Sequence, residues 1–213
     1  MLAEYRVILC DPPWRYQNWS ATKHGAAKSH YPCMKTEEIA RLPIAKIGAE
    51  NCALLMWITL PKLVEGVHLP IMKAWNFRPV TCAFVWNKTD RNGGPYVGLG
   101  FYVRSGAEVC ILGIRGKSPR KKGATCVLQV ITAPRIYKHS RKPDEQYERI
   151  ETLFEGPYLE LFARKERPGW DCLGYEIDGK LLDETLAEHW REWKNGNGLK
   201  RNGGSSDNTE IKG

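Results

Sequence analysis

The sequence predicts an α/β protein built around a buried sheet, and two observations support this fold class. Apolar runs such as YRVILC (5–10) and CALLMWIT (52–59) alternate along the chain with amphipathic segments such as PDEQYERIETLF (143–154). The apolar runs are continuous rather than alternating in polarity, which is typical of strands covered on both faces. We therefore expect a sheet with helices packed on both sides.

Four elements are expected in the first half of the chain. After the first strand, a short helix is expected at 36–42, with Thr36 as its N-cap and acidic residues in its first turn. A second buried strand at 52–59 precedes a helix at 61–75, whose apolar residues recur at helical intervals. Pro70 should kink or split this second helix, because proline interrupts helical hydrogen bonding.

The second half of the chain continues the alternation. Pro143 suits the first position of a helix, and Asp144 and Glu145 suit the positive end of its dipole. The strands are expected at 79–88, 107–116, 126–131 and 158–164, and the helices at 143–154 and 180–194.

A single domain is expected over residues 1–194, because 213 residues fit one domain. The segment 195–213 has no apolar pattern and should form a disordered tail. The apolar runs are too short to cross a bilayer, and the N-terminus reads as the start of the fold rather than a signal peptide. None of the seven cysteines forms a C-x-x-C pair, which favours reduced thiols in a cytoplasmic protein and gives no spacing for a metal site.

The net charge of +8 and the pI of about 9.1 reflect two clusters of basic residues, at 117–122 and 135–142. A basic surface of this kind favours a polyanion such as nucleic acid. The alternative is a solvated loop whose charge keeps the protein in solution. The candidate contacts to a nucleic-acid backbone are Lys117, Arg120, Lys121, Lys122, Arg135 and Lys138.

The tetrapeptide DPPW at 11–14 follows the first strand, and in an open α/β sheet ligands bind beyond the carboxyl ends of strands. Two prolines fix the backbone and remove two N–H donors, so the Asp11 carboxylate and neighbouring carbonyls remain as acceptors. Such acceptors suit the exocyclic amine of adenine, and Trp14 would supply a flat face for a base taken out of its helix. A sulfonium-borne methyl group would then be the electrophile. The alternative is a turn that ends a strand and carries a buried tryptophan.

The loop at 89–106 is long, rich in glycine and aromatic, which is typical of a lid or a binding loop. Its exposed aromatic residues would either dock a second subunit, giving a homodimer, or grip a nucleic-acid duplex.

The sequence resembles the MT-A70-like adenine-N6 methyltransferases over about residues 5–179. The matches occur in the family's order: DPPW at 11–14, HYPCM at 30–34, HSRKPDE at 139–145, and then ELFAR and GWDCLGYE. The resemblance implies a Rossmann-like, S-adenosylmethionine-dependent methyltransferase fold in circularly permuted order, with the catalytic motif before the cofactor strand.

The resemblance also implies roles for individual residues. Lys142 would pair with the cofactor carboxylate, but it could instead be an exposed residue at a helix start. Glu108 would lie near the substrate or be a structural partner of Arg104 or Lys88, and Tyr31 would reach the adenine or pack in the core. The implied set is Asp11, Pro12, Pro13 and Trp14 for catalysis; Tyr31, Glu108 and Lys88 for the substrate; and Cys10, Asp11, Ser140, Lys142, Phe162, Arg164, Tyr175 and Glu176 for the cofactor.

The function that the resemblance implies is methylation of adenine N6 in double-stranded DNA by a phage-type or prophage-type enzyme that uses S-adenosylmethionine. One alternative is a nucleic-acid-binding partner subunit without catalysis. Two others keep the chemistry and change the substrate, to RNA adenine or to cytosine N4. Asp11 favours adenine, because cytosine enzymes of the wider class commonly carry serine there.

Overall fold

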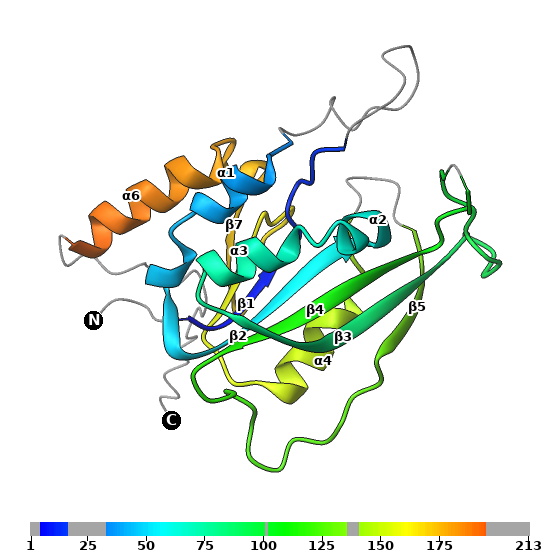
Figure 1. Ribbon diagram of the computed structural model, residues 1–213. Helices are drawn as coiled ribbons and strands as arrows, with labels where there is room; N and C mark the ends of the chain where they lie inside the picture. Colours follow the sequence, from blue (N-terminus) through cyan, green and yellow to red (C-terminus); the bar gives the residue numbers. More distant parts are fainter. Residues whose placement is uncertain (1–4, 17–32, 101, 136–140, 195–213) are drawn as a thin grey trace, which may run out of the picture.

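The structure is a computed structural model, and it describes residues 5–16, 33–100, 102–135 and 141–194 (Figure 1). Tyr31, Lys138, Ser140 and the tail at 195–213 lie outside the described residues. Within the described ranges, none of the helices combines the length and the apolar character that crossing a bilayer requires.

A seven-stranded sheet forms the centre of the described part, and its strand order is β5-β3-β4-β2-β1-β6-β7 (Figure 1). Strand β4 runs antiparallel to both of its neighbours, whereas every other pairing is parallel. The strands are β1 (Tyr5–Cys10), β2 (Gly48–Thr59), β3 (Arg78–Thr89), β4 (Ala107–Arg115), β5 (Val130–Pro134), β6 (Tyr158–Leu161) and β7 (Trp170–Leu173).

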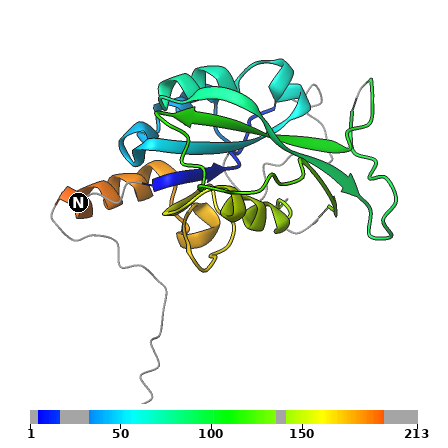
Figure 2. The same ribbon diagram turned by 90° about the horizontal axis from the view of Figure 1, so that it is seen from below.

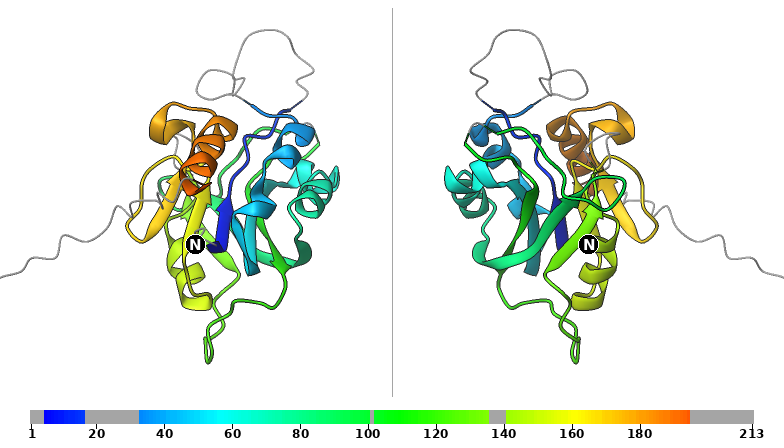
Figure 3. Two further views of the ribbon diagram at one scale, coloured as in Figure 1. Left: turned by 90° about the vertical axis from the view of Figure 1, so that its left-hand side faces the viewer. Right: turned by 90° about the vertical axis from the view of Figure 1, so that its right-hand side faces the viewer.

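Helices cover both faces of the sheet, as the sequence predicts (Figures 2 and 3). Side chains alternate between the faces along β1, so Ile8 joins the core beneath α1, α3 and α6, whereas Leu9 joins the core beneath α4. The helices are α1 (Thr36–Arg41), the 3-10 turn η2 (Ile44–Lys46), α2 (Leu60–Val64), α3 (His68–Ala74), α4 (Glu145–Leu153), α5 (Tyr175–Asp178) and α6 (Leu182–Lys194).

The helix expected at 61–75 is split, but the break precedes Pro70. Gly66 adopts a φ of 71°, which ends α2, and α3 begins at His68. Pro70 therefore lies in the first turn of α3, where its missing N–H removes no bond within the helix. The N-cap of α1 is Lys35 rather than Thr36.

Two strand boundaries also differ from the expectation, and two short elements were not expected. The strand expected at 126–131 begins only at Val130, and the strand expected at 158–164 ends at Leu161. The strand expected at 158–164 ends early because Phe162 takes a φ of 60°, a left-handed conformation that turns the chain. Strand β7 and helix α5 were not expected, because each has only four residues and shows little periodicity.

The turn after β4 gives a test of the fold. Gly116 has a φ of 61°, and a Cβ atom there would lie 2.4 Å from the Glu50 carbonyl oxygen. Gly123 has a φ of 75°, but a Cβ atom there would meet nothing within 4 Å. Gly123→Ala should therefore cost about 1–2 kcal/mol of unfolding free energy through the backbone alone, and Gly116→Ala should cost more. Denaturant unfolding measures both, and equal losses would contradict the predicted clash.

Candidate active site

Charged side chains gather at the sheet edge where the parallel strands end. Asp11 follows β1, and Arg164 follows the turn after β6. Glu108 reaches the same edge because β4 is antiparallel and begins there, with Glu108 in register with Thr59 at the end of β2. Lys142 comes from the loop before α4, on the opposite face from α1.

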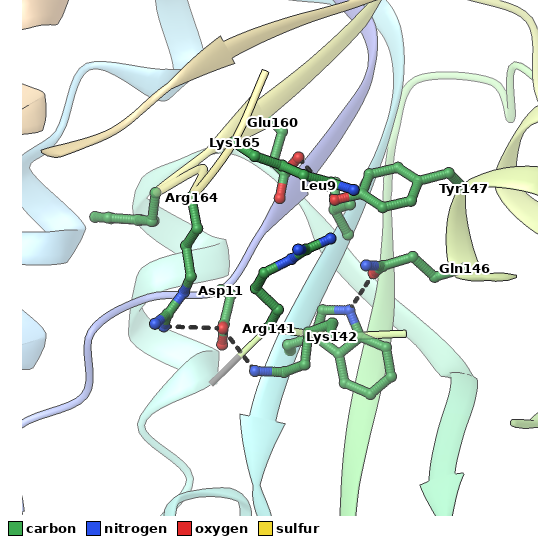
Figure 4. Close-up of a pocket in the computed structure, with 11 residues that line it drawn as sticks. Leu9, Asp11, Arg141, Lys142, Gln146, Tyr147, Glu160, Arg164 and Lys165 are labelled. Atoms are coloured by element: carbon green, nitrogen blue, oxygen red, sulfur yellow. Dashed lines mark hydrogen bonds and ion pairs between the residues drawn. The ribbon is translucent and has the colours of Figure 1, made fainter. Parts of the chain in front are cut away.

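Three cations and three carboxylates alternate across this edge, and their side chains are only 7–18% exposed. Each buried charge is therefore matched by at least one charge of opposite sign. Figure 4 shows Asp11 between Lys142 and Arg164. The atoms are joined in the order Lys88 Nζ to Glu108 Oε1 at 2.5 Å, Glu108 Oε2 to Lys142 Nζ at 3.1 Å, Lys142 Nζ to Asp11 Oδ2 at 2.6 Å, Asp11 Oδ2 to Arg164 Nη2 at 3.4 Å, and Arg164 Nη1 to Glu176 Oε1 at 3.6 Å.

The pairing keeps Glu108 and Lys142 ionised. Burial raises the pKa of Glu108, but the charges of Lys142 and Lys88 outweigh it and bring the pKa to about 2. Burial lowers the pKa of Lys142, but the charges of Asp11 and Glu108 raise it by more than burial lowers it. The net shift of the Lys142 pKa is therefore upward. Glu108 thus contacts Lys88, the partner that one alternative named, and Lys142 is buried rather than exposed at the helix start.

Asp11 presents one carboxylate oxygen to the cations and leaves the other available. Both Lys142 and Arg164 bind Oδ2, and no donor among the described residues bonds Oδ1. The Pro12 carbonyl accepts the Trp14 N–H at 2.8 Å, and the Pro13 carbonyl accepts the Met34 N–H at 2.9 Å. A carbonyl oxygen has two lone pairs, so the Pro12 carbonyl can accept one more hydrogen bond.

Trp14 does not offer the stacking face that the sequence suggests. Its side chain is packed in the core, only 7% exposed, and its indole N–H donates to the Trp57 carbonyl at 3.3 Å. An indole is amphipathic, and here its polar end found a buried partner, so burial costs no unpaired donor. The alternative of a strand-ending turn with a buried tryptophan therefore describes Trp14 itself, while Asp11 stays accessible at the edge.

Two hollows adjoin Asp11, with volumes of ≈ 380 and ≈ 480 Å³, and both are lined by Asp11, Phe162 and Arg164. Both volumes include space that is open to solvent. The φ of 60° at Phe162 is an unusual backbone conformation at the point where the hollows meet. The smaller hollow (Figure 4) is otherwise lined by Leu9, Trp57, Arg141, Lys142, Gln146, Tyr147, Glu160 and Lys165, and the larger by Pro13, Met34, Ala163, Tyr175, Glu176, Leu181 and Leu182.

Two polar residues of the smaller hollow were missed by the sequence reasoning. Glu160 lies on β6, where burial raises its pKa to about 7 against the lowering effect of a hydrogen bond from the Tyr147 hydroxyl at 2.9 Å. Gln146 accepts a hydrogen bond from the indole N–H of Trp57 at 2.6 Å. A polar residue inside an apolar strand could have drawn attention to Glu160, but nothing in the sequence distinguishes Gln146 from an exposed helical residue.

Two further cofactor candidates, Tyr175 and Cys10, differ in their position relative to the hollows. Tyr175 lines the larger hollow, as expected for a cofactor residue. Cys10, in contrast, is fully buried and lines neither hollow, so a cofactor contact through its thiol is not a feature of this structure.

All seven cysteines are unpaired. Among the described residues, no three histidine, cysteine, aspartate or glutamate side chains are grouped as metal ligands would be.

The two basic clusters lie at different edges of the sheet. Arg135 follows β5 at the edge that holds Asp11, with its guanidinium 5.2 Å from the centre of the Tyr96 ring. The cluster of Lys117, Arg120, Lys121 and Lys122 follows the other end of β4 (Figure 1). Arg115 lies seven positions after Glu108 in β4, which corresponds to roughly 24 Å.

Comparison with known proteins agrees with this geometry. The family model described as MT-A70 matches residues 5–176. The chain is 32% identical over 203 residues to the Type II methyltransferase M.MunI of a Mycoplasma species, covering 87% of this chain and 83% of that protein. It is 29% identical to the N(6)-adenine-specific methyltransferase METTL4 of Homo sapiens, over 81% of this chain and 37% of that longer protein.

A further relative carries a name that specifies RNA. The chain is 26% identical to the N6-methyladenosine RNA methyltransferase MTA1 of Cryphonectria parasitica, over 88% of this chain and 55% of that protein. The family match covers most of the chain and includes Asp11, Lys142 and Arg164. The resemblance noted in the sequence is thereby confirmed, and the chain belongs to the MT-A70 family of adenine-N6 methyltransferases.

Proposed function

We propose that the chain transfers a methyl group from S-adenosylmethionine to the N6 amine of adenine in double-stranded DNA in the cytoplasm. The observation that carries this proposal is the position of Asp11, which has an uncommitted Oδ1 and stands between two hollows. One hollow can hold the methyl donor while the acceptor base approaches the carboxylate. The order of the sheet, with Asp11 after β1 and the Phe162 turn after β6, supports a circularly permuted methyltransferase fold.

The residues around the larger hollow fit S-adenosylmethionine. Phe162, Leu181 and Leu182 offer apolar surface to an adenosine group, and the Glu176 carboxylate suits ribose hydroxyls. Arg164 lines this hollow and Lys142 lines the smaller one, and both supply positive charge near Asp11, which suits the carboxylate of the amino-acid end. When bound, S-adenosylmethionine supplies an electrophilic methyl group on a positively charged sulfur.

Asp11 and Pro12 would orient the amine. The Asp11 Oδ1 and the second lone pair of the Pro12 carbonyl would each accept one N–H, which turns the nitrogen lone pair out of the ring plane. Lys142 and Arg164 hold the other carboxylate oxygen, so the acceptor is fixed before the base arrives. After the methyl transfer, Asp11 is placed to receive the proton that the nitrogen loses. Because Asp11 is recessed, with its side chain 18% exposed, a duplex adenine would have to flip out to reach it.

We propose double-stranded DNA rather than RNA as the substrate for two reasons. The sequence resembles phage and bacterial members of the family that are taken to act on DNA, and it is 32% identical over 203 residues to a Type II methyltransferase of a Mycoplasma species. The relative named for RNA keeps the second possibility open to the same assay.

The carboxylate of Asp11 can be removed with little change in shape. Asp11→Asn should lower methyl transfer by about 10²- to 10³-fold, because an amide places a donor where the substrate amine needs an acceptor. The assay follows radiolabelled methyl transfer to unmethylated DNA, with Asp183→Asn on the exposed face of α6 as the matched control.

Folding must be checked in the same experiment, because the exchange leaves Lys142 with one anionic partner fewer. Equal label from wild type and Asp11→Asn of equal thermal stability would refute the role of Asp11. When DNA and RNA are offered together, mass spectrometry of the digested product identifies base and sugar together. N4-methylcytosine or N6-methylated ribonucleoside as the main product would overturn the proposed substrate.

The two basic clusters can be compared on the same substrate. Arg135→Gln should weaken DNA binding and reduce the slope of log affinity against log salt by about one, because one phosphate contact is lost. The double change Lys121→Gln and Lys122→Gln should weaken binding less, because these residues follow the far end of β4. Filter binding at several salt concentrations measures both slopes. A larger effect of the double change would assign the backbone contact to the cluster at 117–122.

A further inference from the structure

Trp14 is packed in the core and does not offer its ring face to an extruded base. Tyr16, two residues further along the chain, is 42% exposed. The backbone is fixed up to this point, since Trp14 and Met34 form a parallel bridge and Arg15 donates its N–H to the Met34 carbonyl. Tyr16 is thus the first exposed aromatic residue after the rigid DPPW turn.

Two contacts hold the Tyr16 side chain. Its hydroxyl lies 2.6 Å from the Thr59 Oγ1, and the Lys62 Nζ lies 5.3 Å from the ring centre. Both partners are near the end of β2: Thr59 is its last residue, and Lys62 is in α2 directly after it. A ring fixed at its hydroxyl end and against one cation has lost much of its rotational freedom before any ligand binds.

Tyr16 lies close to the charged chain. Thr59 is directly opposite Glu108 across the antiparallel pair β2–β4, and side chains of opposed residues project from the same face of a sheet. Glu108 in turn bonds Lys142, which bonds Asp11. Burial raises the pKa of Tyr16 to about 12, against the hydrogen bond with Thr59, and Glu108 and Asp11 also raise it. The ring therefore stays neutral near neutral pH and adds no negative charge beside a polyanion.

We propose that Tyr16 is the residue on which the target base stacks when its amine reaches Asp11. The inference rests on the proposed adenine methylation and deepens it by naming the wall of the base pocket. An aromatic ring stacks on any base, so Tyr16 would contribute binding and alignment rather than recognition of a particular sequence. Lys62, which also pairs with Glu65 at 2.6 Å, adds positive charge next to the ring for the neighbouring phosphate.

The test uses the full chain with Tyr16→Ala, which removes the ring, and Tyr16→Phe, which keeps the ring and removes the hydroxyl. Val64→Ala on α2, where Val64 is 88% exposed, is the bystander control. Tyr16→Ala should lower kcat/KM for methyl transfer to unmethylated DNA on the order of 10- to 100-fold, the loss that one base stack typically causes. Tyr16→Phe should stay within about threefold of wild type, with S-adenosylmethionine affinity and melting temperature unchanged in both.

A second readout does not depend on turnover. A single-stranded oligonucleotide of thymines with one central 2-aminopurine should lose fluorescence on binding wild type and Tyr16→Phe, because stacking on the ring quenches the base, but not on binding Tyr16→Ala. Equal quenching by all three proteins, or equal losses of kcat/KM in the two Tyr16 variants, would overturn the stacking role. If wild type shows no methyl transfer at all, the proposed function fails, and the quenching result still decides the role of Tyr16.

Discussion

The buried pairing of Lys142 with Asp11 and Glu108 is the interaction on which the site depends. Removing charges from water is costly, and a buried ion stays ionised only when opposite charges and hydrogen bonds replace the lost solvent. Here the ammonium group lies 2.6 Å from Asp11 and 3.1 Å from Glu108, so each carboxylate compensates the lysine and is compensated by it. Loss of any one of the three would remove one opposite charge from each of its buried partners, which destabilises the ionised forms that remain.

The single antiparallel strand makes this arrangement possible. In a wholly parallel sheet, the first residues of a strand lie at the edge opposite the carboxyl ends. Because β4 runs the other way between β2 and β3, Glu108 arrives beside Asp11 from the start of its strand, and Lys88 arrives from near the end of the neighbouring strand. The loop before α4 crosses this edge and delivers Lys142 from the other face. One reversal of strand direction thus gathers charges from four separate parts of the chain.

The sequence predicts those parts of the fold and site that local patterns determine. Continuous apolar runs predict the strands, and a strand end followed by two prolines predicts that Asp11 is an edge acceptor. The exposure of a side chain depends on tertiary packing, which the motif does not contain. The motif therefore suggested an exposed ring for Trp14, whereas the structure buries it in the core. The contacts of Lys142 with Asp11 and of Trp57 with Gln146 join residues 131 and 89 positions apart, and no local pattern encodes them. Glu160 was missed although a polar residue inside an apolar strand is a local signal, and its raised pKa comes from burial, which the sequence does not show.

Two aromatic residues follow β1, and we assign them different tasks: Trp14 fixes the DPPW turn, and Tyr16 receives the base. A side chain that fixes a turn must be packed on all sides, whereas a side chain that receives a base must keep one face open. Trp14 meets the first requirement, with its indole N–H bonded to the Trp57 carbonyl and its ring in the core. That packing fixes the backbone on which Asp11 and Pro12 present their oxygens. Under the proposed stacking role, the open face is supplied by Tyr16, whose hydroxyl lies 2.6 Å from the Oγ1 of Thr59, the residue opposite Glu108.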